Sequence, residues 1–187
     1  EKVGMGSLDE AMRATKLQWS HKNLDDEDAK VVAYVVASSS SLVDLPLIGC
    51  EIGDEGAKAL AAGIASSGSM ATLNLYGNRI GDVGAKAIAE AVKSSGSMAT
   101  LYLGGNRIGD EGAKAIAEAV KSSGSLAKLW LSQNSIGDEG AKALAAGVAS
   151  SGSMAYLSLQ LNSNIGAAAK QSLRDAVRGR QGFKLEV

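Results

Sequence analysis

Large apolar residues recur along this chain with a fixed period of 28 residues. Each period begins with a leucine, and a second large apolar residue follows two positions later. The seven leucines that mark the period are Leu17, Leu45, Leu73, Leu101, Leu129, Leu157 and Leu185. A period of this length is typical of a stack of small structural units, each of which buries its apolar faces against its neighbours.

The unit at residues 73–100 predicts one strand and one helix. Its first residues, Leu73-Asn74-Leu75, alternate between apolar and polar, which is the period of a half-buried strand. Apolar residues then recur at helical spacing between residues 83 and 94. Because a helix follows every strand, neighbouring strands must run parallel, with the helices on the other side of the sheet. A helix is wider than the strand spacing of about 4.8 Å, so the stack must bend with its strands inside.

We therefore predict an α/β fold, a right-handed solenoid in the form of a short horseshoe, with a parallel sheet on the concave face and α-helices on the convex face. Residues 1–16 are expected to hold a capping helix, in which Ser7 and Glu10 have the spacing of a capping box. The repeats are expected to span residues 17–164, with units starting at 17, 45, 73, 101, 129 and 157. Residues 165–187 are expected to form a capping helix and a seventh, closing strand.

Polar residues at fixed repeat positions predict how each unit is built. Asp82 precedes the helix of its unit, where we expect its carboxylate to be the N-cap. The equivalent residues are Asp54, Asp110 and Asp138. Gly96 follows that helix and is expected to be a left-handed C-cap. Asparagine occupies one more fixed position in four units, and Cys50 takes this position in the second unit. The asparagines are Asn78, Asn106, Asn134 and Asn162.

The pattern LxLxxNxIGDxGAKA(I/L)A, present at residues 73, 101 and 129, resembles the leucine-rich repeat. The length of 28 residues and the helical outer segment resemble the ribonuclease-inhibitor-like subtype in particular. The resemblance implies an internal ladder of asparagine side chains and a buried Cys50. Members of this subtype inhibit nucleases, activate the hydrolysis of a small GTPase, cap actin filaments or sense ligands. The short arc is closest in size to the actin-capping repeat domain of tropomodulin, and no binding residue of the family carries over position by position.

Composition excludes several functions. The net charge is −1, with 19 basic and 20 acidic residues, so the sequence does not predict a nucleic-acid partner. No stretch approaches the roughly 18 apolar residues of a membrane span, so no membrane partner is expected. The lone cysteine favours a reducing, cytoplasmic location. The chain starts with Glu1, which is consistent with a piece of a longer protein.

Catalysis is not expected from these residues. His21 is the only histidine, so the chain has no histidine-based triad and no multi-histidine metal site. The aspartates at the helix starts recur once in each layer, where helix capping explains them better than a metal does. The glycine pairs, such as Gly104-Gly105, lack the Lys-Ser/Thr ending of a phosphate-binding loop. We predict no enzyme activity, no cofactor and no metal.

The strand positions that face away from the core give the main functional hypothesis. This chain has seven aromatic residues, and four of them occupy such positions on four successive strands: Tyr76, Tyr102, Trp130 and Tyr156. Tyr102 and Trp130 are expected to be lateral neighbours, with Tyr76 and Tyr156 extending the row diagonally. Aromatic residues are enriched among binding hot spots, although they also favour strands in general. With Asn74 and Lys128 beside them, they predict a protein-binding patch on the concave face.

Two alternatives stay open. The first is a regulator of an enzyme, an activator of a GTPase or an inhibitor, acting through Arg79 and Arg107, which occupy the same turn position in adjacent units. The second is a structural or designed repeat without a ligand of its own, which the near-identity of residues 78–98 and 106–126 favours. In each case the chain is expected to be a monomer or a weak homodimer.

Overall fold

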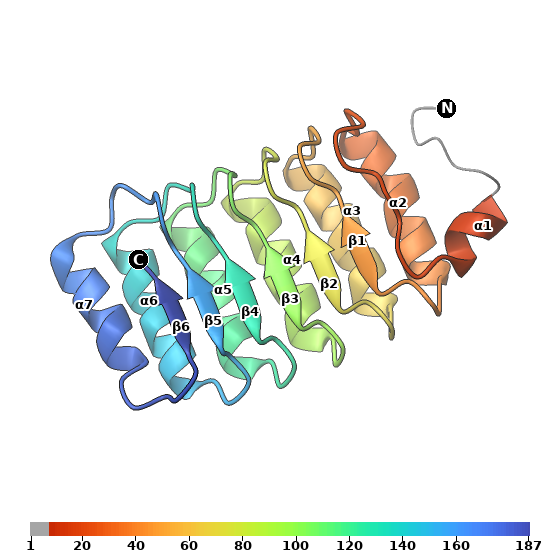
Figure 1. Ribbon diagram of the computed structural model, residues 1–187. Helices are drawn as coiled ribbons and strands as arrows, with labels where there is room; N and C mark the ends of the chain where they lie inside the picture. The colour runs from red at the N-terminus through yellow and green to blue at the C-terminus, as the bar shows by residue number, and fades with distance from the viewer. Residues whose placement is uncertain (1–7) are drawn as a thin grey trace.

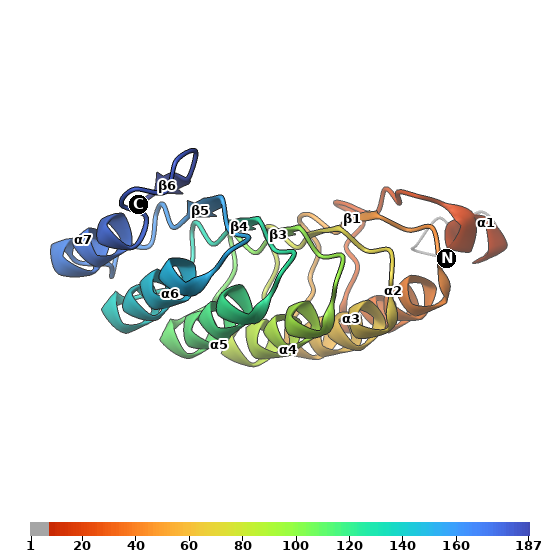
Figure 2. The ribbon, with the colours of Figure 1, turned by 90° about the horizontal axis from the view of Figure 1, so that it is seen from below.

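The computed structural model describes residues 8–187 and shows a curved stack of strand–helix units (Figure 1). Six strands form one parallel sheet in chain order: β1 (Asp44–Pro46), β2 (Thr72–Asn74), β3 (Thr100–Tyr102), β4 (Lys128–Trp130), β5 (Tyr156–Ser158) and β6 (Lys184–Glu186). The helices are α1 (Leu8–Arg13), α2 (Asp26–Ser38), α3 (Asp54–Ser66), α4 (Asp82–Ser94), α5 (Asp110–Ser122), α6 (Asp138–Ser150) and α7 (Ala167–Ala176). Figure 2 shows the strands along the inside of the arc and α2 to α7 along its outside. The predicted α/β solenoid is confirmed.

The leucines that mark the period lie side by side in the sheet. Each strand pairs with the residues 28 positions later, so Leu73 lies between Leu45 and Leu101. All three side chains are fully buried between the sheet and the helices. Leu17 and Leu185, in the first and last layers, are only partly buried. The period in the sequence is therefore the period of the core.

The prediction of seven strands is wrong by one. Residues 16–20 run beside β1, but only an isolated bridge between Lys16 and Asp44 forms there. In a parallel sheet, every second residue of a strand donates its backbone N–H to the same neighbouring strand. Asp44 donates to the carbonyl of Thr15, and the next donor would be Pro46, which has no amide hydrogen. Ile48 then donates its backbone N–H to the hydroxyl of Ser20, at 3.2 Å, and not to a main-chain carbonyl. The proline ends the ladder on this side of β1.

The aspartates at the helix starts do not cap their own helices. The N-cap residues of α3 to α6 are the glycines before them, and these have no side-chain cap. Asp82 is instead the first residue of α4, and its Oδ1 accepts the backbone N–H groups of Gly109 at 2.7 Å and Gly112 at 2.9 Å. These amides open the next helix, α5. Each aspartate therefore caps the helix of the following unit, and a β-carbon on Gly112 would lie only 2.7 Å from the same oxygen.

Gly96 is not a left-handed C-cap, which corrects the second capping prediction. The C-cap of α4 is Ser95, with φ −84°, and Gly96 is not among the residues with positive φ. The hydroxyl of Ser95 accepts the backbone N–H of Met98 at 3.1 Å, and the hydroxyl of Ser97 donates to the carbonyl of Met70 at 2.8 Å. Serine side chains thus order the loop after the helix and tie it to the preceding unit.

The asparagine ladder is present as the family resemblance implies. The amide group of Asn106 donates to the carbonyls of Leu75 and Leu103, at 3.0 and 3.1 Å, and its Oδ1 accepts the N–H of Ile80 at 3.0 Å. The equivalent asparagines make equivalent bonds. Cys50 takes this position in the second unit, where it is buried and its thiol bonds the carbonyl of Trp19 at 3.5 Å. It is a structural residue.

The two ends of the stack are closed differently. At the start, Ala11 of α1 and Trp19 are both buried, and the capping box predicted at Ser7 lies outside the described residues. At the far end, α7 and β6 cover the last layer. The guanidinium of Arg180 donates to the carbonyls of Val148 and Met154 and lies 5.0 Å from the centre of the Phe183 ring. At Met154, Arg180 takes the place of the serine hydroxyls that donate to the equivalent carbonyls of Met70, Met98 and Leu126 in earlier units.

Candidate binding surface

Three aromatic rings form a continuous stack across the inner face of the sheet. Tyr102 of β3 is the register partner of Trp130 of β4, and their ring centroids lie 4.1 Å apart with planes 19° apart. Trp130 then meets Tyr156 of β5 diagonally, at 4.4 Å and 34°. All three side chains are half-buried. The predicted neighbours therefore do meet, and each ring limits the rotation of the next.

Charged residues of β6 hold the far end of this stack. The hydroxyl of Tyr156 donates to a carboxylate oxygen of Glu186 at 2.7 Å, and the Lys184 ammonium lies 5.4 Å from the Tyr156 ring centre. Lys184 and Glu186 also form an ion pair at 2.7 Å. Burial, and then the bond to Glu186, raise the pKa of Tyr156 above its ordinary value, while Lys184 lowers the pKa of Glu186. The last ring is therefore fixed by a bond that requires its proton.

Tyr76 does not extend the stack. Its ring lies over the next unit, where a β-carbon on Gly104 would come within 3.0 Å of its Cδ2 and one on Gly105 within 3.4 Å of its Cζ. Its hydroxyl donates to the side-chain carbonyl of Gln133, two units away along the rim. The strand neighbour of Tyr102 on this side is Asn74. The pair Gly104-Gly105 thus has a structural reason, because it makes room for Tyr76.

A polar groove of about 310 Å³ lies beside the stack on the inner face. Its walls include Thr72, Asn74 and Tyr102, and the ion pair between Lys16 and Asp44, at 2.5 Å, forms its other end. The Oδ1 of Asn74 accepts the backbone N–H of Tyr76 at 3.0 Å. Asn74 therefore orients the turn after β2 and lines the groove as well.

The candidate cations differ in their partners. Lys128 is exposed beside Tyr156, its register partner, and makes no ion pair with any described residue. Arg79 pairs with Glu51 at 3.2 Å, which neutralises one member of the predicted arginine pair. Arg107 is exposed, and no carboxylate among residues 8–187 pairs with it. Lys128 and Arg107 are thus the cations of this region that are available to a partner.

Two residues on the rim after the strands escaped the sequence analysis. Gln133 has φ 55° and Leu161 has φ 58°, both in the left-handed region. The same repeat position is glycine at residues 49, 77 and 105, also with positive φ. This row of glycines was the signal that could have found them, because a larger residue there adopts an unfavourable backbone conformation.

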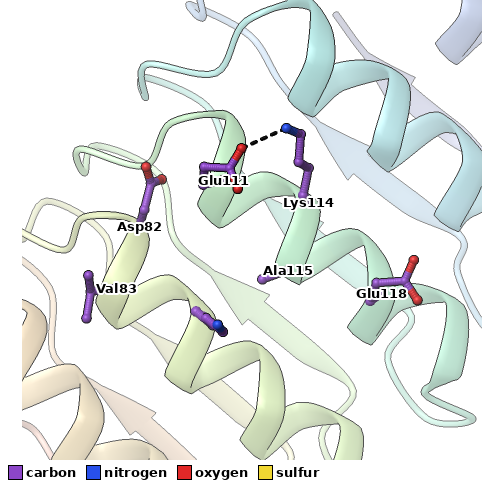
Figure 3. Close-up of a pocket in the computed structure, with 7 residues that line it drawn as sticks. Asp82, Val83, Glu111, Lys114, Ala115 and Glu118 are labelled. Carbon is purple, nitrogen blue, oxygen red and sulfur yellow. Dashed lines mark hydrogen bonds and ion pairs between the residues drawn. The ribbon is translucent and has the colours of Figure 1, made fainter.

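The outer face carries a second groove, of about 420 Å³, between α4 and α5 (Figure 3). Figure 3 shows Val83 on one wall and the ion pair of Glu111 with Lys114, at 2.7 Å, on the other. Helices α3, α5 and α6 carry a glutamate where α4 has Val83, and that glutamate pairs with a lysine three residues later. The groove is an exposed surface between paired helical charges, and it brings together no reactive side chains.

Within residues 8–187, no group of three histidine, cysteine or acidic side chains is placed to hold a metal ion. His21 lies against Gly49, where a β-carbon would come within 2.4 Å of its Nδ1. No helix in this part of the chain is long and apolar enough to cross a bilayer.

Comparison with known proteins agrees with this architecture. The family model described as "Leucine Rich repeat" matches residues 38–61, 69–89, 97–117 and 125–145, one stretch in each of four successive units. The chain is a leucine-rich repeat protein. The ribonuclease-inhibitor-like subtype stays a prediction. Among curated proteins, no sequence matches this leucine-rich repeat chain.

Two solved structures have the same fold as this leucine-rich repeat protein. Actin-binding site 2 of leiomodin-1 superposes with a TM-score of 0.70 at 18% identity, over 80% of this chain and 86% of the other. The C-terminal domain of Caenorhabditis elegans tropomodulin superposes with a TM-score of 0.66 at 13% identity, over 80% of this chain and 91% of the other. At these identities the likeness establishes the fold alone.

Proposed function

We propose that this leucine-rich repeat protein is a binding scaffold that holds another protein on its concave face and performs no catalysis. The stack of Tyr102, Trp130 and Tyr156 carries the proposal. It presents a large, half-exposed aromatic surface whose rings are already fixed by one another and by β6. Fixed aromatic side chains lose little conformational entropy on binding and are enriched among residues that dominate interface energetics. Asn74, Tyr76 and Lys128 surround this anchor.

Actin is the first partner to test. The leiomodin-1 domain whose fold this chain shares is an actin-binding site of that protein. A short arc of six strands also offers an inner face about 24 Å wide at the usual strand spacing, enough for a protein contact of ordinary size. A cytoplasmic location and a monomeric or weakly dimeric state belong to the same proposal.

The test compares Trp130→Ala with Tyr34→Ala, which removes an exposed aromatic (58% exposed) from the convex helix α2. Binding to purified actin is measured first by co-sedimentation and titration, and then to any partner that the wild type captures from a lysate of its source organism. We expect Trp130→Ala to fold normally and to weaken binding at least tenfold, which is about 1.4 kcal/mol. Tyr34→Ala should bind like the wild type. Equal affinity of Trp130→Ala and wild type would refute the proposal.

Regulation of an enzyme through the rim is the second candidate, and the free guanidinium of Arg107 favours it. Arg79 contributes less, because Glu51 already pairs with it. The double variant Arg79→Gln and Arg107→Gln tests this role against Trp130→Ala. Loss of regulation in the arginine variant, with the aromatic stack intact, would favour the regulator. A protein that binds no partner by either surface would be a structural module.

A further inference from the structure

The residue four positions after each repeat leucine has a left-handed backbone. The φ values at this position are all between 55° and 71°, for His21, Gly49, Gly77, Gly105, Gln133 and Leu161. The turn after the strand therefore imposes this conformation on every unit, whatever residue stands there. Glycine adopts it without strain, whereas a side chain brings its β-carbon too close to the following carbonyl.

Two of the three residues with side chains gain a contact within the chain. Gln133 accepts the hydroxyl of Tyr76, and the ring of His21 fills the space above Gly49. Leu161 is different, because its side chain is 73% exposed. It is the most exposed of the large apolar side chains in the described part of the chain. Strain at Leu161 therefore has no compensation in the folded monomer, and such outliers are concentrated at functional sites.

Leu161 lies on the rim close to the aromatic stack. It follows β5, and its neighbour Gln160 accepts the backbone N–H of Gln133 at 2.9 Å. Gln133 follows Trp130 by three residues, which is about 10 Å along an extended strand. A single extended segment of a partner can therefore contact Leu161 and Trp130 together.

The charge of the inner face and its rim indicates what kind of segment this is. In each unit, the strand and the turn after it span the residue before the repeat leucine to the sixth residue after that leucine. In the described units these segments hold six cations and three carboxylate side chains, although the whole chain has a net charge of −1. All three carboxylates are paired: Asp44 with Lys16, Glu51 with Arg79, and Glu186 with Lys184. The unpaired charges are then all positive: Lys22, Arg107 and Lys128. This surface is complementary to a negatively charged partner.

We infer that Leu161 is a partner-contact residue, and that together with the aromatic stack it holds an acidic polypeptide segment with an apolar side chain. The apolar side chain packs on Leu161, and carboxylates of the segment pair with Lys128 and Arg107. This inference rests on the proposed function, because the same segment must also contact Trp130. Leu161 is conformationally unfavourable for the fold and useful only when the partner is bound.

Random peptides displayed on phage and selected on the wild-type protein supply the probes for a test. Their net charge is determined, and their affinities are then measured for Leu161→Ala, Leu161→Gly, Trp130→Ala and a double reversal, Lys128→Glu with Arg107→Glu. Val83→Ala on α4 is the matched control, because it removes a similarly exposed apolar side chain (52% exposed) from the convex face. The melting temperatures of all variants are recorded.

We expect the selected peptides to be acidic, and Leu161→Ala and Leu161→Gly each to weaken their binding about fivefold or more. Leu161→Gly should also melt at a temperature equal to or up to about 3 °C above that of the wild type, because strain is relieved. The charge reversal should abolish binding, and Val83→Ala should change neither property. A loss of binding at Leu161 without a loss of stability is the signature of a contact residue.

The failures of the inference and of the proposed function are distinct. If Trp130→Ala loses the peptides and both Leu161 variants retain them, the inference fails and the aromatic site stands. If neither position matters, or if no peptide is selected, both fail. Neutral or basic peptides would contradict the acidic partner. A clearly lower melting temperature of Leu161→Gly would show that Leu161 supports the fold, which also overturns the inference.

Discussion

The carboxylate of Asp82 accepts the backbone N–H of Gly109, 27 residues later, at 2.7 Å. Asp82 begins α4, whereas Gly109 is the N-cap residue of α5. A local motif in one unit thus satisfies the free amides at the start of the next helix. In a stack whose stability depends on contacts between neighbours, such a bond couples each layer to the following one.

Asp82→Ala should lower the free energy of unfolding by about 1–2 kcal/mol, the usual range for loss of a side-chain cap. Urea denaturation measures this change, with Val83→Ala, an exposed neighbour, as a control that should be nearly neutral. Amide hydrogen exchange locates the effect. Faster exchange at Gly109 and Gly112 is expected, whereas faster exchange at the start of α4 alone would contradict the bond between units.

Gly84→Ala and Gly96→Ala should have opposite effects although both glycines belong to one unit. A β-carbon on Gly84 would lie 2.7 Å from Asp54 Oδ1 and 2.9 Å from Ala57, so we expect a loss of about 1–3 kcal/mol. Gly96 has open space around it and no positive φ, so alanine should stabilise the fold by up to about 1 kcal/mol. Thermal unfolding of both variants is the measurement. Destabilisation by Gly96→Ala would instead support a left-handed C-cap conformation at Gly96.

Asn106→Ala should destabilise the protein by about 1–3 kcal/mol, because it removes the partner of one backbone amide and one of the two asparagine donors to each of two carbonyls. The affected groups are the carbonyls of Leu75 and Leu103 and the amide of Ile80. Cys50→Asn is the matched change, since it extends the asparagine row by one unit. We expect its midpoint of denaturation to equal or exceed that of the wild type. A large loss of stability in Cys50→Asn would show that the first layer cannot accept the asparagine ladder.

The phenol of Tyr156 should ionise at a higher pH than an ordinary tyrosine, because its pKa is raised by burial and by the bond to Glu186. A group with a raised pKa in the folded state binds its proton more tightly there than in the unfolded chain. Its contribution to stability is complete below the unfolded pKa of about 10 and is lost as the pH rises through the folded pKa. Ultraviolet titration of wild type and Tyr156→Phe checks the assignment. An unchanged last phase of ionisation in Tyr156→Phe would contradict it.

Much of the architecture followed from the sequence because it depends on local periodicity. The spacing of Leu45, Leu73 and Leu101 required a parallel stack, and the alternation of Asn74 with two leucines assigned the strand faces. The neighbours Tyr102 and Trp130 could be predicted for the same reason, since equivalent residues of adjacent units must lie side by side. The asparagine ladder followed from the family pattern.

Tertiary contacts decided what the period leaves open. Asp82 could bond its own helix or the next one, and only the distance between units selected the next. Tyr76 could turn toward the stack or along the rim, and the space over Gly104 directed it to Gln133. Leu161 looked ordinary in the sequence, because neither its backbone conformation nor its exposure is encoded by hydrophobic pattern. The sequence by itself determined the stack and its inner aromatic face. The folded structure decided which side chains reach across units, because those choices depend on contacts between residues about 28 or more positions apart.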